Sequence, residues 1–172
     1  MTVRLRIGIG QEGPRWTMGY VNRFDLLYAD LPGRSGRRST IQGSYDLILR
    51  VSADQVLTSI EVLPKSAYWQ VVPGLQAPLA ERGQVYVVED IDDGQTQAYL
   101  TDPEYSVFYA RLGEERLPGE VRWVAIADNV ILEVARDGTL AGVWLLDLPP
   151  EIAQTRRQAR TTSGANGPAR PM

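Results

Sequence analysis

The sequence has 172 residues, an apolar fraction of 44%, a charged fraction of 23% and a formal net charge of −3, which are typical of one soluble globular domain. It contains neither cysteine nor histidine, which excludes disulfides, thiolate nucleophiles, the usual zinc sites and any Ser-His-Asp or Cys-His centre. Residues 1–152 carry 14 basic and 21 acidic side chains, whereas residues 153–172 carry four arginines and no acid. Because an acidic globule lacks the basic face that nucleic acids require, we expect no nucleic-acid partner.

The first element expected in chain order is a strand at Val3–Ile9, where apolar and polar residues alternate. It leads into Gly8, Gly10 and Gly13, which spell the G-x-G-x-x-G of a dinucleotide-binding turn. That motif needs a helix at its last glycine, but Pro14 and another β-like run follow. We therefore interpret the glycines as a turn. Since neither a signal peptide nor a membrane-length apolar run is recognisable, we expect a cytoplasmic protein with no membrane partner.

Period-two alternation and frequent turn residues continue and predict an all-β domain. The further strands expected are Phe24–Leu31, Tyr45–Val51, Gln55–Leu63, 84–91, 95–100, 105–112, 120–126, 129–135 and 139–146. The pair at 84–91 and 95–100 is predicted to form a hairpin. One short helix is predicted from Pro150 to about Ala159. The rest of residues 153–172 is a basic tail, residues 160–172, which has no apolar anchor and is predicted to be disordered.

The chain is predicted to contain a duplication. A shift of 83 residues places 46–63 on 129–146 without a gap, and 24–31 lies on 105–112 at nearly the same shift. This indicates two copies of a four-stranded meander, at 20–70 and 101–152, in a single β domain that covers 1–152. The N-terminal strand and the 84–100 hairpin are interpreted as additions. With the short C-terminal helix, these copies predict a barrel- or sandwich-like fold, all-β with minor α.

The second copy resembles a small bacterial family, domain of unknown function 2283, whose members read approximately YDPEADALYIRL and VxLDxDxDGxVVGIEIL. The matching segments here are "TDPEYSVFYARL" and "VILEVARDGTLAGVWLLD". Two of the family's acids are replaced in the second copy, by Ser106 and Trp144, but are kept in the first as Asp25 and Glu61. Members with a single copy are too small to hold a cavity, so the resemblance implies pairing with another chain, for example as an antitoxin-like module.

Candidate functional residues follow from residue type. Carboxylates are the plentiful acid–base groups, so Asp25 and Glu61 are the catalytic candidates; the other interpretation is surface or turn residues paired with arginine. Aromatic residues in connections, or inside a barrel, are candidates for ligand binding, although each also fits a core role: Trp16, Tyr20, Tyr68, Trp69 and Trp123.

The strands around residues 130–132 and 143–146 are apolar on both faces. One face packs on the core, and the other needs a partner subunit, the C-terminal helix or a ligand as cover. We predict a homodimer with Trp144 in its interface.

Two functions remain open. The first is a small β-barrel that binds an apolar metabolite in an aromatic-lined cavity and acts as a cofactor-free cyclase in natural-product biosynthesis. In size and aromatic content the chain is similar to small actinobacterial pericyclases, which hold a flexible substrate in a reactive conformation. The second is a partner-binding protein, antitoxin-like or regulatory, without catalytic activity. Neither function calls for a cofactor or a metal.

Overall fold

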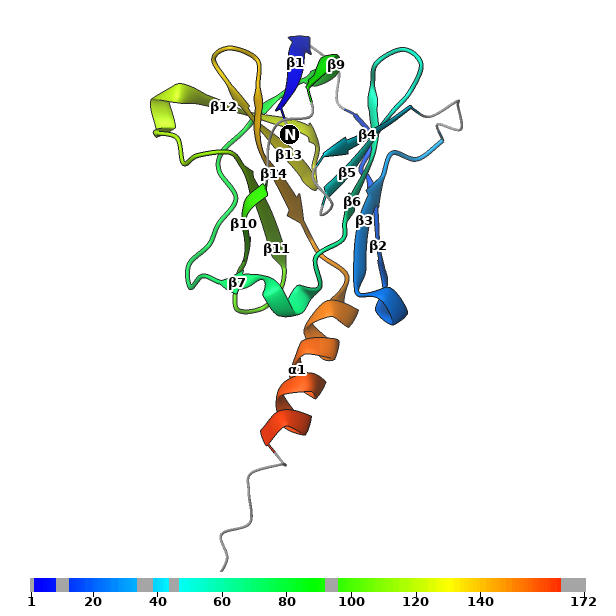
Figure 1. The fold of residues 1–172 in the computed structure, drawn as a ribbon, viewed down its shortest axis with the longest axis vertical. Coiled ribbons are helices and arrows are strands. Elements are labelled where there is room, and N and C mark those ends of the chain that lie inside the picture. Colours follow the sequence, from blue (N-terminus) through cyan, green and yellow to red (C-terminus); the bar gives the residue numbers. More distant parts are fainter. Residues whose placement is uncertain (1, 9–12, 34–38, 44–46, 92–95, 165–172) are drawn as a thin grey trace, which may run out of the picture.

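The computed structural model describes residues 2–8, 13–33, 39–43, 47–91 and 96–164. Strands dominate this part of the chain and one α-helix follows them, so the predicted all-β class with a minor helical part is confirmed. No sheet formed by the described residues closes on itself, and the arrangement is therefore sandwich-like. Figure 1 shows the two large sheets side by side, with the helix α1 (Pro150–Gly164) projecting below them.

The first sheet comes from the first half of the chain and has the order β2-β3-β6-β5-β4, with antiparallel neighbours. Its strands are β2 (Thr17–Val21), β3 (Leu26–Asp30), β4 (Ser39–Gly43), β5 (Leu47–Val51) and β6 (Leu57–Val62). In β3 and β5 the alternate residues are buried and those between them are half-exposed, which is the pattern that predicted these strands. The strand β4 was not predicted.

The second sheet comes from the second half and has the order β7-β10-β11-β14-β13-β12-β8. Its main strands are β10 (Thr96–Thr101), β11 (Val107–Leu112), β12 (Val121–Ala127), β13 (Val130–Ala135) and β14 (Leu140–Leu146). The connection between the halves adds two short parallel edge strands, β7 (Gln70–Val71) and β8 (Glu81–Arg82). Three 3₁₀ turns lie between strands: η1 (Asn22–Phe24), η2 (Ser66–Tyr68) and η3 (Pro118–Glu120).

The duplication is visible in the strand pairing. The orders β3-β6-β5-β4 and β11-β14-β13-β12 are equivalent. Within each repeat the first strand lies beside the fourth, which is a Greek-key order and not the simple meander that we predicted. The two copies also share the register of their strand pairing. Both have a β-bulge at the equivalent position, in β5 after Arg50 and in β13 after Glu133.

The repeats extend further than the sequence indicated. The strands β1 (Thr2–Gly8) and β9 (Gln84–Ile91) pair with each other, and β10 pairs with β11, so the predicted 84–100 hairpin is wrong. Leu5 N donates to the carbonyl of Gly138 over 2.7 Å, and Val87 N donates to that of Gln55 over 2.8 Å. Since Leu5 lies opposite Val87 in the ladder, β1 and β9 occupy equivalent places. They are part of the repeats and not additions to them.

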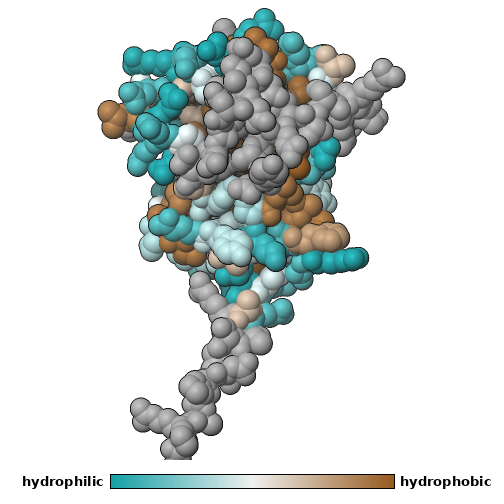
Figure 2. Space-filling view, viewed as in Figure 1, coloured by the Kyte–Doolittle hydropathy of each residue, from teal (hydrophilic) through white to brown (hydrophobic). Residues whose placement is uncertain are grey.

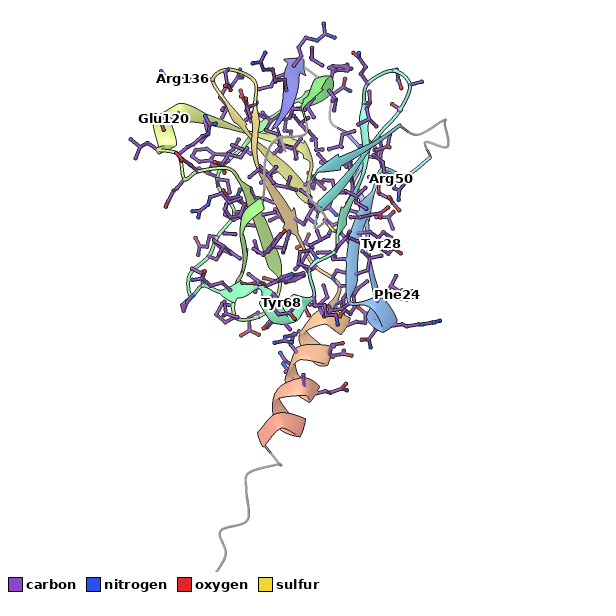
Figure 3. The ribbon with its side chains drawn as sticks, viewed as in Figure 1. Phe24, Tyr28, Arg50, Tyr68, Glu120 and Arg136 are labelled. Atoms are coloured by element: carbon purple, nitrogen blue, oxygen red, sulfur yellow. The ribbon has the colours of Figure 1, made fainter. Side chains whose placement is uncertain are left out.

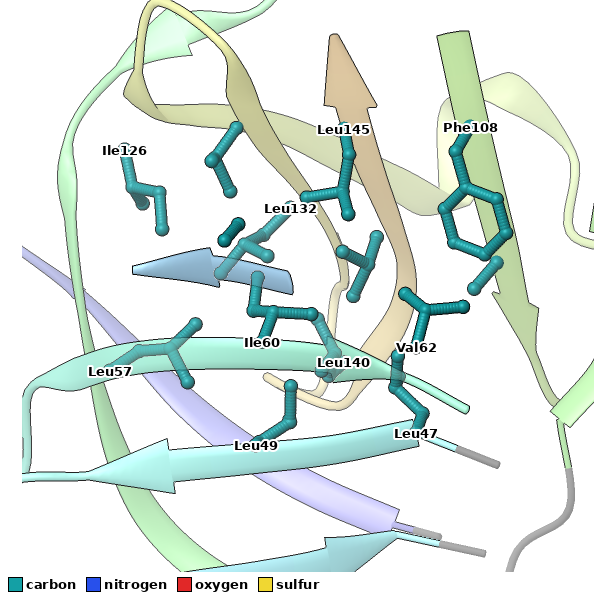
Figure 4. Close-up of a cluster of buried hydrophobic side chains, with 14 of the residues drawn as sticks. Leu47, Leu49, Leu57, Ile60, Val62, Phe108, Ile126, Leu132, Leu140 and Leu145 are labelled. Atoms are coloured by element: carbon teal, nitrogen blue, oxygen red, sulfur yellow. The ribbon is translucent and has the colours of Figure 1, made fainter. Parts of the chain in front are cut away.

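The core lies between the two sheets and beneath the β1–β9 pair. Residues on the inner faces form one cluster of buried side chains. Figure 4 shows members from both repeats in this cluster: Leu47, Leu49, Leu57, Ile60, Val62, Phe108, Ile126, Leu132, Leu140 and Leu145. Apolar burial of this kind is the main contribution to the stability of the sandwich.

The helix α1 begins at the predicted Pro150 but extends to Gly164, beyond the predicted end near Ala159. It is anchored at its start by Ile152, which is fully buried. The tail predicted to be disordered begins at residue 160, so the prediction is wrong for residues 160–164, which are helical; residues 165–172 lie outside the described part. The visible surface is mainly hydrophilic with scattered hydrophobic patches (Figure 2). No helix within the described ranges is long and apolar enough to cross a membrane.

Candidate functional site

The outer face of the second sheet is covered by the chain itself. Residues 70–83, which we call the strap, run from β7 at one edge of this sheet to β8 at the other. Tyr109 and Trp144 stack on this face, with ring centroids 4.2 Å apart. Apolar residues of the strap pack against the cluster that they form with Ile131: Leu75, Ala77 and Ala80.

The strap explains the two-sided apolar pattern that suggested a homodimer. Trp144, the predicted interface residue, is only 7% exposed within one chain. The predicted need for a cover was therefore sound, but a segment of the same chain supplies it. The dimer interface at Trp144 remains a prediction, but the two-sided apolar pattern does not support it, because the strap accounts for that pattern.

The cluster under the strap also contains a buried carboxylate. The Tyr109 hydroxyl donates to Glu133 Oε2 over 3.1 Å. Burial of the ring and the charge of Glu133 raise the pKa of Tyr109 well above its ordinary value. Trp123, a predicted ligand-binding residue, packs at the edge of this cluster on the outer face. It does not lie in the sandwich interior.

The matching face of the first sheet has no such cover among the described residues. Its central side chains are partly exposed and belong to β3, β5 and β6; we call them the open face: Tyr28, Ile48, Arg50 and Glu61. Their counterparts under the strap are all buried, with at most 8% exposed: Tyr109, Ile131, Glu133 and Trp144. Figure 3 shows Tyr28 and Arg50 on the side of the first sheet turned away from the second.

Glu61, a predicted catalytic residue, is held in an ion pair. Arg50 Nε donates to Glu61 Oε1 over 2.6 Å, with the two side chains 29% and 19% exposed. The hydrogen bond to Glu61 raises the pKa of Arg50, which keeps the guanidinium charged. The pair replaces Glu133 and Trp144 of the second sheet, so the open face is more polar than its counterpart. This contact fits the interpretation of a carboxylate paired with arginine.

Asp25, the other catalytic candidate, joins two turns at the lower end of the first sheet. It ends η1 in the left-handed conformation, with φ of 52°. Its carboxylate accepts a hydrogen bond from the Tyr20 hydroxyl over 2.7 Å and another from Ser66 N over 3.1 Å. Asp25 and Glu61 therefore have separate partners and form no acid–base pair with each other.

Tyr20 should titrate late because of its burial and this contact. Burial, together with the hydrogen bond to Asp25 and its charge, raises the pKa of Tyr20 from 10.0 to about 12. The stability that the protonated Tyr20 contributes to the folded protein is fully present below pH 10 and is lost as the pH rises through about 12. In an ultraviolet titration of phenolate, Tyr20→Phe should remove one late step, and Asp25→Asn should move that step to lower pH. A late step that Asp25→Asn leaves at the same pH would show that the Tyr20–Asp25 contact is absent in solution.

The five aromatic candidates do not gather in one pocket. Trp69 is buried against Phe108, with ring centroids 4.6 Å apart, and donates from Nε1 to the Pro64 carbonyl over 3.1 Å. Tyr68 is 75% exposed and lies beside the start of α1 (Figure 3). Tyr20 lies at the same end, whereas Trp16 lies on a different part of the sandwich.

Trp16 lines a cleft of about 240 Å³ between the two repeats. Its walls combine apolar and polar side chains, including Val56, Tyr86 and Asp54. Sequence reasoning missed Asn129, whose amide accepts from Trp16 N over 3.1 Å and donates to Trp16 O over 2.8 Å. This buried clamp joins the start of β2 to the β12–β13 turn, and so connects the repeats beside the cleft.

The chain matches no protein-family model and no curated protein. What the site can do has therefore to be argued from its geometry.

Proposed function

We propose that this protein is a partner-binding protein that holds an extended protein segment on its open face. One observation carries the proposal. Four positions that are buried under the strap on the second sheet are partly exposed at the same register on the first sheet. Since the two sheets share order and register, the fold already contains an example of how an extended segment lies across such a face.

The strap also shows how the edge of such a sheet accepts a segment. On the second sheet, β7 pairs in parallel with the edge strand β10, and Val72 N donates to Thr101 O over 2.8 Å. On the first sheet, β2 occupies the position of β10 and, within the described ranges, is an edge strand. Addition of a strand to an exposed edge is a common way to bind a peptide, because backbone hydrogen bonds give affinity and side-chain contacts give specificity.

The chemistry of the open face suits a protein partner. It combines an aromatic ring, an aliphatic side chain and an ion pair, and such mixtures are typical of non-obligate interfaces. The Tyr28 ring lies directly over Gly19 of β2, so close that a side chain at Gly19 would overlap it. The ring is therefore presented beside the edge where a segment would pair.

The proposal is tested by cross-linking from the open face. A photoreactive benzoylphenylalanine at Tyr28 should give a light-dependent adduct in cells that make this protein naturally, and the same residue at the exposed Tyr68 should not. Ile48→Glu in the Tyr28-labelled protein should reduce the adduct by about tenfold or more, as expected for a central interface residue. Equal adducts at both positions, or none at Tyr28, would contradict the proposal.

A second candidate function is the binding of an apolar small molecule in the cleft. The position of Trp16 on its wall favours this function. The cleft is smaller than the roughly 300–1,000 Å³ of common ligand sites. Since neither Asp25 nor Glu61 lines it, the cofactor-free cyclase stays a hypothesis that would depend on shape alone. We therefore place partner binding first.

A further inference from the structure

The two repeats have equivalent turns at the end of the sandwich from which α1 projects (Figure 1). One turn connects β2 to β3, and the other connects β10 to β11. In the first turn Asp25 N donates to the Asn22 carbonyl over 3.2 Å. In the second turn Tyr105 N donates to the Asp102 carbonyl over 3.1 Å. Asp25 and Tyr105 are therefore equivalent, and both have a left-handed backbone, with φ of 52° and 56°.

The helix α1 meets the two turns differently. At the first turn, the Thr155 hydroxyl donates to the Asn22 side chain over 3.3 Å. At the second turn, the helix and the chain leave a hollow of about 130 Å³ between them. Its lining comes from this turn and from one face of α1: Pro103, Glu104, Tyr105, Ala153, Arg156 and Arg157.

The lining of the hollow contains hydrogen-bond donors without acceptors. Arg156 Nε is buried and has no hydrogen-bond partner among the described residues. Tyr105 is only 6% exposed, and its hydroxyl has no partner in the described part of the chain. Buried polar groups are normally paired, so these two need an explanation. A ligand with acceptor oxygens in the hollow would supply one.

The backbone of Tyr105 supports the same explanation. The left-handed region is tolerated by aspartate but is uncommon for a bulky side chain, and the first turn has Asp25 at this position. Strained residues of this kind are concentrated at functional sites. Here the strained residue forms part of the wall of the hollow.

The lining of the hollow has a positive net charge. Arg156 and Arg157 carry two positive charges and Glu104 carries one negative charge, in a protein whose formal net charge is −3. Arg157 Nη2 and Glu104 Oε2 are 3.7 Å apart, with the side chains 74% and 77% exposed. Such an exposed ion pair contributes little, so an anion can compete with Glu104 for Arg157. Guanidinium groups are well suited to oxyanions, because they present several N–H donors in one plane.

We propose that this hollow binds the oxyanion of a phosphoryl group, held by Arg156, Arg157 and the Tyr105 hydroxyl. The volume corresponds to about four water molecules, so it takes one such group and leaves little room for more. The ligand is therefore inorganic phosphate or the phosphate end of a small phosphomonoester whose remainder lies in solvent. The site is separate from the open face and does not depend on the proposed function.

The proposal is tested by calorimetric titration of the full chain with inorganic phosphate near neutral pH. At about 0.1 M NaCl, which screens long-range attraction, the protein should bind one phosphate saturably in the millimolar range or tighter. Arg156→Gln should weaken this binding by about tenfold or more. The matched control is Arg23→Gln, which removes the same charge from the first turn, where Arg23 is exposed, and should leave the affinity unchanged.

Two further variants probe the hollow in opposite directions. Tyr105→Phe should weaken phosphate binding by about two- to tenfold, because one hydrogen bond is lost. Glu104→Gln should strengthen it by about threefold or more, because it removes the opposing charge. Since Glu104 is 77% exposed, this variant should fold like the wild type.

A parallel titration with glycerol phosphate identifies the source of the phosphoryl group. Tighter binding than that of inorganic phosphate assigns the site to an ester, and equal or weaker binding assigns it to the free ion. The proposal is overturned if neither probe binds saturably. Equal affinities of Arg156→Gln and Arg23→Gln, or no gain in Glu104→Gln, would also overturn it, because the anion would then lie elsewhere.

Discussion

The Trp144→Glu variant is expected to lose about 3–5 kcal/mol of unfolding free energy, since large buried aromatic residues contribute this much and an unpaired buried charge adds a cost. Trp144 is 7% exposed, stacks on Tyr109 and lies under the strap. The new carboxylate would also lie close to Glu133, whose carboxylate is bonded to the same tyrosine. Equilibrium unfolding in urea, followed by fluorescence, measures the change.

A double variant supplies the control. Adding Glu133→Arg to Trp144→Glu rebuilds on the second sheet the ion pair that Arg50 and Glu61 form on the first. The double variant should recover at least about 1 kcal/mol relative to the single variant, because the buried charge gains a partner. If Trp144→Glu unfolds at the wild-type urea midpoint, the strap does not cover this face in solution.

The second large effect is expected at Asn129. Its buried amide satisfies both the N–H and the carbonyl of Trp16. Asn129→Ala leaves these two backbone groups without partners, and each buried unsatisfied group costs about 1–3 kcal/mol. We expect a loss of about 2–5 kcal/mol in urea unfolding. The exposed amide Gln154 is the matched control, and Gln154→Ala should change stability by less than about 0.5 kcal/mol. Equal midpoints for the two variants would contradict the role of Asn129 as a clamp.

The repeats could be predicted because their inner faces keep apolar residues in step. Leu49 and Leu132 occupy one equivalent inner position, and Ile60 and Val143 occupy another. Alternation is a local property, so a strand can be recognised from its own residues. The same pattern showed that the face bearing Trp144 needs a cover. It did not show which segment supplies it.

The pairing of β1 with β9 could not be predicted in this way. A run such as 84–91 followed by Asp92-Asp93-Gly94 and 95–100 is a good hairpin signal. In the structure β9 pairs instead with β1, which lies about 80 residues earlier in the chain. Strand formation depends on which neighbour is available, and this is a tertiary property. The strap was missed for a related reason, since a segment with Pro73 and Pro78 has no alternation and is easily interpreted as a loop.

The candidate site residues show the same limit. Asp25 and Glu61 were singled out by comparing the two copies, and that comparison did point to where the sheets differ. Their partners, Tyr20 and Arg50, come from neighbouring strands, so the ion pair and the turn contact became visible only in the fold. Asn129 gave no signal, because an asparagine after a strand is expected in any turn.

The strap has one more consequence, which concerns symmetry. Two equivalent halves in one chain present two equivalent outer faces, but they need only one connection between them. Here that connection lies across one of the faces. A single crossing cannot serve both halves, so an asymmetric surface follows from joining symmetric parts. One outer face is therefore covered by a segment of the chain, whereas the equivalent outer face has no such cover among the described residues.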